Sequence, residues 1–290
     1  MTPAARINAV IELMDEIIGT ERPADAIMSA YFRARKFIGS KDRSNVSNHT
    51  YRVLRNFLRL NWHLDRAGAQ LTGRNIMLTE LLLAENLERE VMRGIFSGEK
   101  YSPAKLREEE TYLTSRLLER GFEPDDMPEA VRLECPPEYA DKFRAVFGES
   151  FADEMRGMMT EAPLDLRVNP RIMEREDALR ELWRSKIEAA ACKLSPLGIR
   201  VVGRPNLPTL DLFKRGAIEI QDEGSQLIAF LLGAKPGEAV VDFCAGAGGK
   251  TLAIAAQMNN KGRVVACDIS DKRLSNARTR FTRAGLNNIQ

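Results

Sequence analysis

The sequence predicts a multidomain protein in which an all-helical N-terminal part is followed by α/β structure. Three patterns support this prediction. Apolar residues recur at helical spacing through residues 1–125, two strand candidates flank a helix within 136–209, and a strand, a glycine-rich loop, a helix and a second strand follow one another in 239–268. A proline-rich, acidic break at 124–137 separates the helical part from the rest.

Composition excludes several classes of protein. With 44% hydrophobic and 29% charged residues over 290 positions, the chain has the balance of a soluble globular protein. It has neither an apolar run of about 18 residues nor a signal-peptide core, so we expect a cytoplasmic protein that does not enter membranes. Four cysteines without a C-x-x-C pair and only two histidines argue against zinc, other metals and disulfides.

The helical part should contain five amphipathic stretches. In the first of them Ile7, Val10, Ile11 and Met14 fall on one face, and the others carry similar patterns. We expect helices over residues 4–19, 25–37, 44–67, 78–96 and 103–121.

Charge is unevenly distributed, although the net charge of the chain is only +2. Residues 31–66 hold nine basic residues against Asp42 and Asp65, a local charge of +7, whereas residues 80–134 have a local charge of −6. Arg52, Arg55 and Arg59 should therefore lie on an exposed basic face, which is either suited to phosphate contacts or simply solvated.

The middle and last parts should alternate strands and helices. We expect a helix over 140–147, a strand over 164–168, a helix over 175–190 and a strand over 199–202. A strand over 216–220 and a helix over 222–232, capped by Asp222, come next. The remaining elements are a strand over 239–243, a helix over 251–258, a strand over 263–268, a helix over 271–284 and the approach to a third strand at 285–290.

The segment from Val241 to Thr251, VDFCAGAGGKT, is the most informative part of the chain. Its glycines allow a ligand to approach the backbone closely, and the following helix start offers free N–H groups. Asp268, at the end of the next strand, is placed to accept hydrogen bonds from ribose hydroxyls.

Three nucleotide sites compete as interpretations of this loop. A P-loop would need glycine where Cys244 stands, and a dinucleotide fingerprint would need its third glycine where Thr251 stands. An S-adenosylmethionine site needs a tight loop after one strand and an acid after the next, and both are present.

Several motifs together resemble one family. Q-D-E-G-S-Q at 221–226, P-G-E at 236–238 and D-F-C-A-G-A-G-G-K-T at 242–251 are similar to those of Sun-type RNA cytosine-C5 methyltransferases, in particular the RsmB-like enzymes that methylate small-subunit ribosomal RNA. The family loop usually reads C-A-x-P-G-G-K-T, and Ala247 replaces its proline here. Leu166 to Pro170 is similar to the family's L-R-x-N signature, in which Arg167 and Asn169 could contact RNA or cap local turns.

The resemblance implies a domain order and partners. Residues 1–125 would form an all-α NusB-like RNA-binding domain, 136–209 a small α/β, RRM-like segment, and 210–290 the first part of an α/β Rossmann-like methyltransferase domain. RNA, most simply ribosomal RNA, would be the partner of a monomeric protein. Its contacts in the basic region would come from Arg33, Arg35, Lys36, Arg52, Arg55 and Arg59.

The resemblance also implies a cofactor, S-adenosyl-L-methionine. Lys250 would balance the cofactor carboxylate, Asp268 would bind the ribose, and Arg273 would either support the adenosine side or remain a solvated arginine. The Q-D-E-G-S-Q segment should be mainly structural. The methionine part would lie against the backbone of Cys244, Ala245, Gly246, Ala247, Gly248 and Gly249.

No catalytic nucleophile is expected in these 290 residues. Enzymes of this family add a cysteine thiolate to C6 of cytosine, which makes C5 nucleophilic. Their two cysteines come from D-x-P-C and T-C-S motifs, and neither motif occurs here. We therefore expect an N-terminal fragment of an RNA cytosine-C5 methyltransferase that is inactive alone. The alternative is a non-catalytic RNA-binding protein that uses the helical module.

Overall fold

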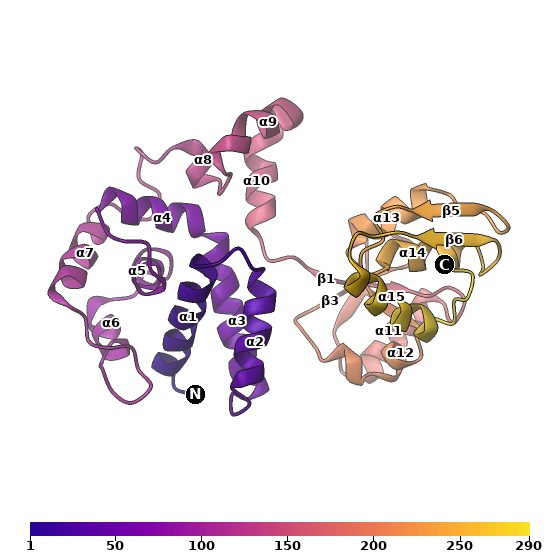
Figure 1. Cartoon of the computed structure of the whole chain (residues 1–290), viewed down its shortest axis with the longest axis horizontal. Coiled ribbons are helices and arrows are strands. Elements are labelled where there is room, and N and C mark those ends of the chain that lie inside the picture. The colour runs from indigo at the N-terminus through magenta and orange to yellow at the C-terminus, as the bar shows by residue number, and fades with distance from the viewer. The chain divides into compact units, whose positions relative to one another are not determined.

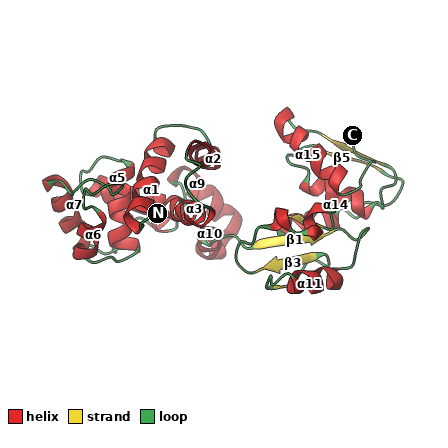
Figure 2. Ribbon diagram, turned by 90° about the horizontal axis from the view of Figure 1, so that it is seen from below, coloured by secondary structure: helices red, strands yellow, loops and turns green.

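The computed structural model describes residues 1–290, which form two compact units, Met1–Glu161 and Ala162–Gln290. The first unit is entirely helical, and every strand lies in the second (Figure 1, Figure 2). The division into domains 1–125, 136–209 and 210–290 stays a prediction. No helix in the chain is long and apolar enough to span a membrane.

The main group of helices in this unit confirms the predicted helical content, but the helix boundaries differ from the predicted ones. Leu13, Met14, Leu60, Ile76 and Leu81 are among the residues that fill its core. Its helices are α1 (Pro3–Ile18), α2 (Ala24–Ala34), α3 (Ser40–Arg55), α4 (Phe57–Arg66), α5 (Gly73–Thr79), a π-helical turn (Glu80–Ala84), α6 (Arg89–Ile95) and α7 (Glu108–Leu118).

The single helix expected over 44–67 is broken at Asn56. The break frees the first N–H groups of α4, and the Glu134 carboxylate accepts those of Leu58 and Arg59 at 2.8 and 3.1 Å. A carboxylate at a helix N-terminus is favourable because it satisfies N–H groups that lack an intrahelical partner. The break was not predictable because the capping group lies more than 70 residues away.

A second cluster of helices completes the unit. It consists of α8 (Glu129–Arg132), α9 (Pro137–Phe147) and α10 (Phe151–Met159), which pack around Cys135, Phe151 and Met155. The helix expected over 140–147 is confirmed as α9, whereas α10 was not predicted.

The second unit begins with a four-stranded antiparallel sheet of order β2-β3-β1-β4. Leu166, Val168, Leu182, Ile199 and Ile218 form its core. The strands are β1 (Leu164–Val168), β2 (Ala189–Ala191), β3 (Gly198–Val201) and β4 (Ile218–Ile220), and the helices are α11 (Arg175–Arg184) and α12 (Asp211–Lys214). The helix expected over 175–190 thus stops at Arg184, and its last predicted residues belong to strand β2 at the sheet edge.

The unit ends with a parallel pair of strands, β5 (Ala239–Asp242) and β6 (Arg263–Ala266). The helices α13 (Glu223–Leu231), α14 (Gly249–Gln257) and α15 (Asp271–Arg283) accompany them. Ile289 bridges Val264 in parallel, as expected for the approach to a third strand. The predicted order of strand, loop, helix, strand and helix is confirmed.

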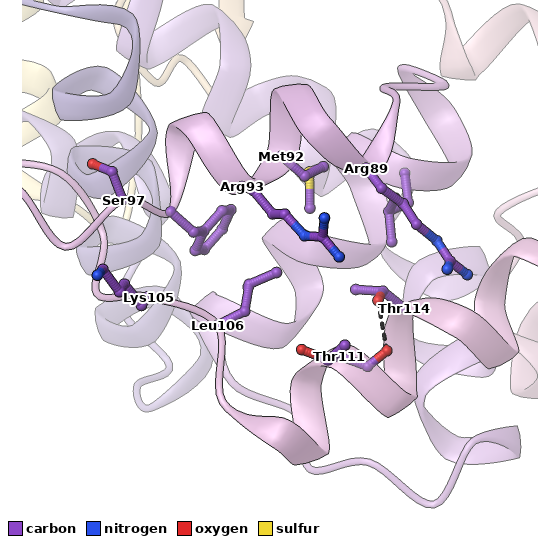
Figure 3. Close-up of a pocket in the computed structure, with 10 residues that line it drawn as sticks. Arg89, Met92, Arg93, Ser97, Lys105, Leu106, Thr111 and Thr114 are labelled. Carbon is purple, nitrogen blue, oxygen red and sulfur yellow. Dashed lines mark hydrogen bonds between the residues drawn. The ribbon is translucent and has the colours of Figure 1, made fainter.

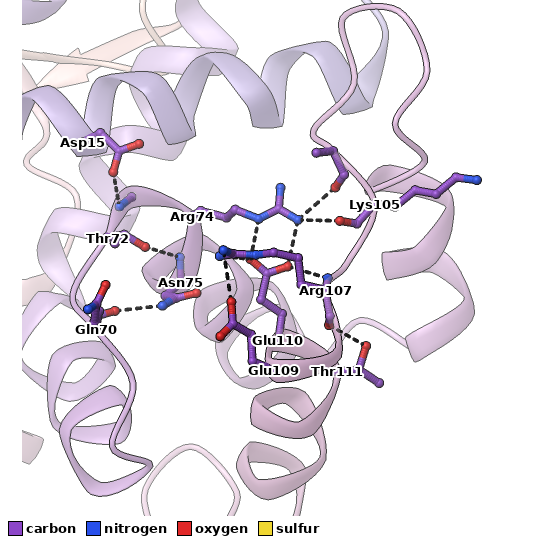
Figure 4. Close-up of polar contacts among 12 residues, drawn as sticks. Asp15, Gln70, Thr72, Arg74, Asn75, Lys105, Arg107, Glu109, Glu110 and Thr111 are labelled. Carbon is purple, nitrogen blue, oxygen red and sulfur yellow. Dashed lines mark hydrogen bonds and ion pairs between the residues drawn. The ribbon is translucent and has the colours of Figure 1, made fainter.

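A buried carboxylate joins α5 to α7 in the helical unit (Figure 4). Glu110 accepts hydrogen bonds from Arg74 Nε at 2.7 Å and from the N–H of Arg107 at 2.9 Å. Burial alone would raise the pKa of Glu110, but the hydrogen bonds from Arg74 and Arg107 outweigh it and lower the pKa to about 2. Arg74 also donates to the carbonyl groups of Ala104 and Lys105, which fixes the loop before α7.

We predict that Glu110→Gln destabilises the protein by about 1–3 kcal/mol at neutral pH, because hydrogen bonds to a charged group are lost. The pKa of Glu110 is lower in the folded state than its ordinary value of 4.5, so the stabilisation is complete above pH 4.5 and lost as pH falls toward 2. Urea unfolding followed by circular dichroism at several pH values would measure this. A difference between the two proteins that did not shrink at acid pH would contradict it.

Candidate cofactor-binding site

The loop between β5 and α14 folds tightly because two of its glycines have positive φ. Gly246 has φ +55° and Gly248 has φ +79°, in the left-handed region that favours glycine. A Cβ on Gly248 would lie 2.5 Å from the Phe281 ring of α15. Gly248 is therefore required both for its conformation and for the close approach of α15.

Asp268 lies beside this loop and is bound to it. Its Oδ2 accepts the N–H of Gly246 at 2.8 Å, and its Oδ1 accepts the N–H of Ser270 at 2.9 Å. These hydrogen bonds lower the pKa of Asp268, and the positive charge of Arg273 lowers it further. Asp268 is consequently ionised at neutral pH, with a negative charge next to the glycine loop.

Other internal hydrogen bonds hold the loop in place. Ala245 donates its N–H to the carbonyl of Cys267 at 2.8 Å, and the N–H of Gly248 bonds back to the carbonyl of Ala245. Thr251 Oγ1 donates to Asp242 Oδ2 at 2.7 Å, which ties the first turn of α14 to the end of β5.

The structure thus places the glycine loop and Asp268, the two predicted parts of the site, in direct contact. Ala245 and Gly248 are buried, Cys244 and Ala247 are exposed, and Gly246, Gly249 and Lys250 are intermediate. Arg273 is exposed in the first turn of α15. The cofactor contacts predicted for these residues stay predictions.

Two arginines donate hydrogen bonds to carbonyl groups of the loop. Arg167 of β1, only 4% exposed, donates from Nη1 to Gly249 O at 2.9 Å and to Gln221 Oε1 at 2.6 Å. Arg280 of α15 donates from Nη1 to Ala247 O at 2.6 Å. Sequence reasoning assigned no role at this loop to either residue.

The four-stranded sheet anchors both arginines and α15. Glu219, buried on β4, accepts from Arg280 Nε at 3.1 Å and is also paired with Arg283. Asn169 at the end of β1 donates to the carbonyl groups of Gly216 and Ala284 at 3.3 and 3.2 Å. Both residues are buried and join the sheet to the loop and to α15, and Asn169 also caps the local turn by accepting the N–H of Arg171 at 3.2 Å. Contact of either residue with RNA stays a prediction.

The Q-D-E-G-S-Q segment has the structural role that was predicted. Asp222 caps α13 by accepting the N–H of Ser225 at 3.0 Å. Gln226 is buried, donating to the carbonyl groups of Leu166 and Gln221 and accepting from Ser195 Oγ. The segment therefore fixes α13 against the four-stranded sheet.

The predicted RNA-contacting residues of the helical unit differ in solvent exposure and in ion pairing. Arg33 and Lys36 are exposed, and Arg55 is intermediate. Arg35 pairs with Glu12 at 3.1 Å, and Arg52 pairs with the buried Glu80 at 2.7 Å.

Arg59 departs from the expected basic face. It is 7% exposed and donates to Glu134, Glu123 and Asn56. Its guanidinium stabilises the contact of α4 with the segment after α7. We therefore remove Arg59 from the proposed set of RNA-contacting residues.

A cavity of about 310 Å³ lies elsewhere in the helical unit, where sequence reasoning proposed no site (Figure 3). Met92 and Leu106 contribute apolar surface, whereas Arg89, Arg93 and Lys105 contribute positive charge. It contains none of the residues predicted to bind RNA or cofactor.

Two family models match the chain. Residues 136–207 match the ferredoxin-like domain of RsmF/B-like methyltransferases, and residues 229–290 match the 16S rRNA methyltransferase RsmB/F family. The second match covers the glycine loop, Asp268 and α15.

Known proteins with similar sequences include RNA methyltransferases. Ribosomal RNA small subunit methyltransferase B of Pseudomonas syringae pv. tomato is 30% identical over 203 residues, which are 70% of this chain and 43% of that protein. The human tRNA (cytosine(72)-C(5))-methyltransferase NSUN6 is 32% identical over 115 residues, 39% of this chain and 24% of that protein. The matched part thus spans less than half the length of either relative.

A solved structure shares the fold. The crystal structure of PH0851 covers 100% of this chain and 69% of its own, with a TM-score of 0.73 and 20% sequence identity.

We predict that Gly248→Ala disrupts the loop, because the added Cβ would require both a left-handed alanine and displacement of Phe281. Gly233→Ala is the matched control, since Gly233 also has positive φ but its Cβ would meet nothing nearer than 3.9 Å. Hydrogen exchange of residues 244–252 should rise in the first variant only. Equal exchange in both variants would contradict the predicted role of α15 packing.

We predict that Arg167→Lys costs about 2–4 kcal/mol of stability, since an ammonium cannot reproduce the planar geometry of the guanidinium and stays buried. The control is Arg171→Lys, because Arg171 is exposed and its side chain donates to Gly285 O. Urea unfolding would compare the two variants. A loss in Arg167→Lys no larger than in the control would show that the buried contact is dispensable.

Proposed function

We propose that the chain, which is similar to RsmB/F-type methyltransferases in residues 136–207 and 229–290, serves S-adenosylmethionine-dependent methylation of C5 of cytidine in RNA, with small-subunit ribosomal RNA as the target. The observation that carries this proposal is the contact between Asp268 and the N–H of Gly246, which joins an ionised carboxylate to a tight glycine loop. We assign cofactor binding to the α/β unit and RNA binding to the helical unit.

The hydrogen bonding of the loop favours this cofactor over a pyrophosphate. Phosphate-binding loops present a series of free N–H groups to the anion. Here the N–H groups of Ala245, Gly246 and Gly248 already bond to Cys267 O, Asp268 and Ala245 O. The carboxylate of Asp268 would also repel a phosphate placed at the N–H of Gly246.

The residues present fit S-adenosylmethionine. Each carboxylate oxygen of Asp268 accepts one backbone N–H and keeps capacity for a ribose hydroxyl. The first N–H groups of α14, with Lys250 beside them, suit the cofactor carboxylate. The backbone of Cys244 to Gly249 would line the methionine part, and Arg273 would either support the adenosine side or remain a solvated arginine.

When bound, the cofactor supplies an electrophilic methyl group. The residues of this chain hold it: Arg167 and Arg280 fix the loop carbonyl groups, so the loop keeps its shape without rearranging when the ligand arrives. The D-x-P-C and T-C-S motifs do not occur in these 290 residues. We therefore assign no step of cytosine activation to any of its cysteines.

RNA binding is assigned to the exposed cations of the helical unit. Arg33 and Lys36 are its leading candidates, with the half-buried Arg55 next, followed by Arg35 and Arg52, which share their charge with carboxylates. A second candidate, a non-catalytic RNA-binding protein that uses only this unit, rests on the exposed cations Arg33 and Lys36 alone.

We predict that Asp268→Asn raises the Kd for S-adenosylmethionine at least tenfold, because it replaces the charge that faces the loop and the ribose. Isothermal titration calorimetry would measure it, with Asp271→Asn, an exposed acid of the same helix start, as the control. RNA affinity should not change in either variant. Binding of ATP or NAD in preference to S-adenosylmethionine would reject the proposed cofactor.

A further inference from the structure

Two aromatic rings of the helical unit lie at the surface on one hollow. Phe37, which follows α2, is 80% exposed, and Tyr101, in the loop before α7, is 70% exposed. Both line an open hollow of about 750 Å³ beside α1, which we call the aromatic hollow. Burying such a ring would stabilise the fold by about 1.5–3 kcal/mol, so neither exposed ring contributes its full potential to folding.

Tyr101 is held at the rim by an unfavourable backbone conformation. Its φ of +70° lies in the left-handed region, which costs a non-glycine residue roughly 1–2 kcal/mol. The loop is closed by hydrogen bonds from Gly98 N–H to Pro103 O and from Ser102 N–H to Glu99 O. Because the ring is exposed, its own packing does not offset this cost.

The floor of the aromatic hollow suits a flat, uncharged group. Ala5, Ala9 and Ile38 are buried there and present small apolar surfaces. Asn8 uses its Nδ2 to bond Glu12 Oε1 at 3.0 Å, which leaves its amide oxygen as an acceptor.

The only carboxylate in the lining is already neutralised. Glu12 pairs with Arg35 at 3.1 Å and accepts the Tyr31 hydroxyl at 2.9 Å. Burial, together with the hydrogen bond to Glu12, raises the pKa of Tyr31, so its phenol stays protonated. The guanidinium of Arg35 lies 3.7 Å from the centre of the Tyr31 ring.

Basic residues stand next to both rings in the sequence. Lys36 precedes Phe37, Lys100 precedes Tyr101 with its Nζ 5.1 Å from the ring centre, and Arg33 is exposed at the end of α2. Exposed aromatic rings among cations are the means by which proteins bind single-stranded nucleic acid, with bases on the rings and phosphates near the cations. A duplex would not fit, because its base faces are covered by neighbouring pairs.

We propose that the aromatic hollow binds unpaired bases of an RNA strand, which stack on Phe37 and Tyr101. This inference rests on the proposed function, since it specifies how the helical unit would contact its RNA.

The test measures fluorescence anisotropy of a labelled, unstructured RNA of about 12 nucleotides with the full chain. Phe37→Ser and Tyr101→Asn should each raise the Kd about tenfold, which corresponds to about 1.4 kcal/mol. Asparagine tolerates the left-handed conformation, so the second variant removes the ring without added strain. Tyr112→Asn is the matched control, since Tyr112 is 66% exposed in the same unit but lies outside the hollow.

Salt dependence separates stacking from phosphate contacts. Removal of either ring should leave the slope of log K against log salt unchanged, whereas Lys36→Gln should reduce it by about 0.7. Tyr101→Phe should retain wild-type affinity, and a duplex of the same sequence should bind all ring variants equally.

The outcomes distinguish the two proposals. If wild-type chain binds the single strand and both ring variants bind it equally well, the stacking site is wrong and RNA binding stands. If wild-type chain binds no RNA, both the stacking site and the proposed RNA function fail, while cofactor binding is judged separately by Asp268→Asn.

Discussion

The buried guanidinium of Arg167 is the constraint on which the α/β unit depends. Its Nη1 binds Gln221 and the carbonyl of Gly249, and its Nε has no hydrogen-bond partner. Burial lowers the pKa of Arg167 to about 10, with Glu219 opposing and Arg280 adding to this effect, so the group remains charged at neutral pH. A buried charge without its acceptors is costly, and separating the sheet from the loop would therefore be strongly unfavourable.

This constraint makes the four-stranded sheet part of the proposed cofactor-binding site. Glu219 on β4 binds two arginines of α15, Asn169 just after β1 binds the carbonyl of Ala284 at the end of that helix, and Arg280 donates to the loop carbonyl of Ala247. The glycine loop is thus held on one side by Asp268 and on the other by groups anchored in the sheet. A site preorganised in this way needs little ordering when a ligand binds.

In the helical unit, ion pairs with carboxylates likewise determine which basic side chains remain free for phosphate contacts. Glu134 engages Arg59, the buried Glu80 engages Arg52, and Glu12 engages Arg35. The local charge of +7 over residues 31–66 therefore overstates the free positive surface, which is concentrated at Arg33 and Lys36, close to Phe37. Three arginines of the basic stretch, Arg52, Arg59 and Arg66, pair with acids of residues 80–134.

The sequence by itself determined features that depend on neighbouring residues: the helical stripe of α1, the cap at Asp222, and the strand, loop and helix that carry Gly246, Gly248 and Asp268. Most of the element types and the resemblance to the RsmB/F family followed from these local patterns. Only the tertiary structure decided that Arg59 is internal while Arg33 is free, that Arg167 holds the loop, and that Phe37 and Tyr101 share a hollow. The reason is physical: these outcomes depend on partners roughly 60 to 80 residues apart, which only the folded chain brings within hydrogen-bond or packing distance.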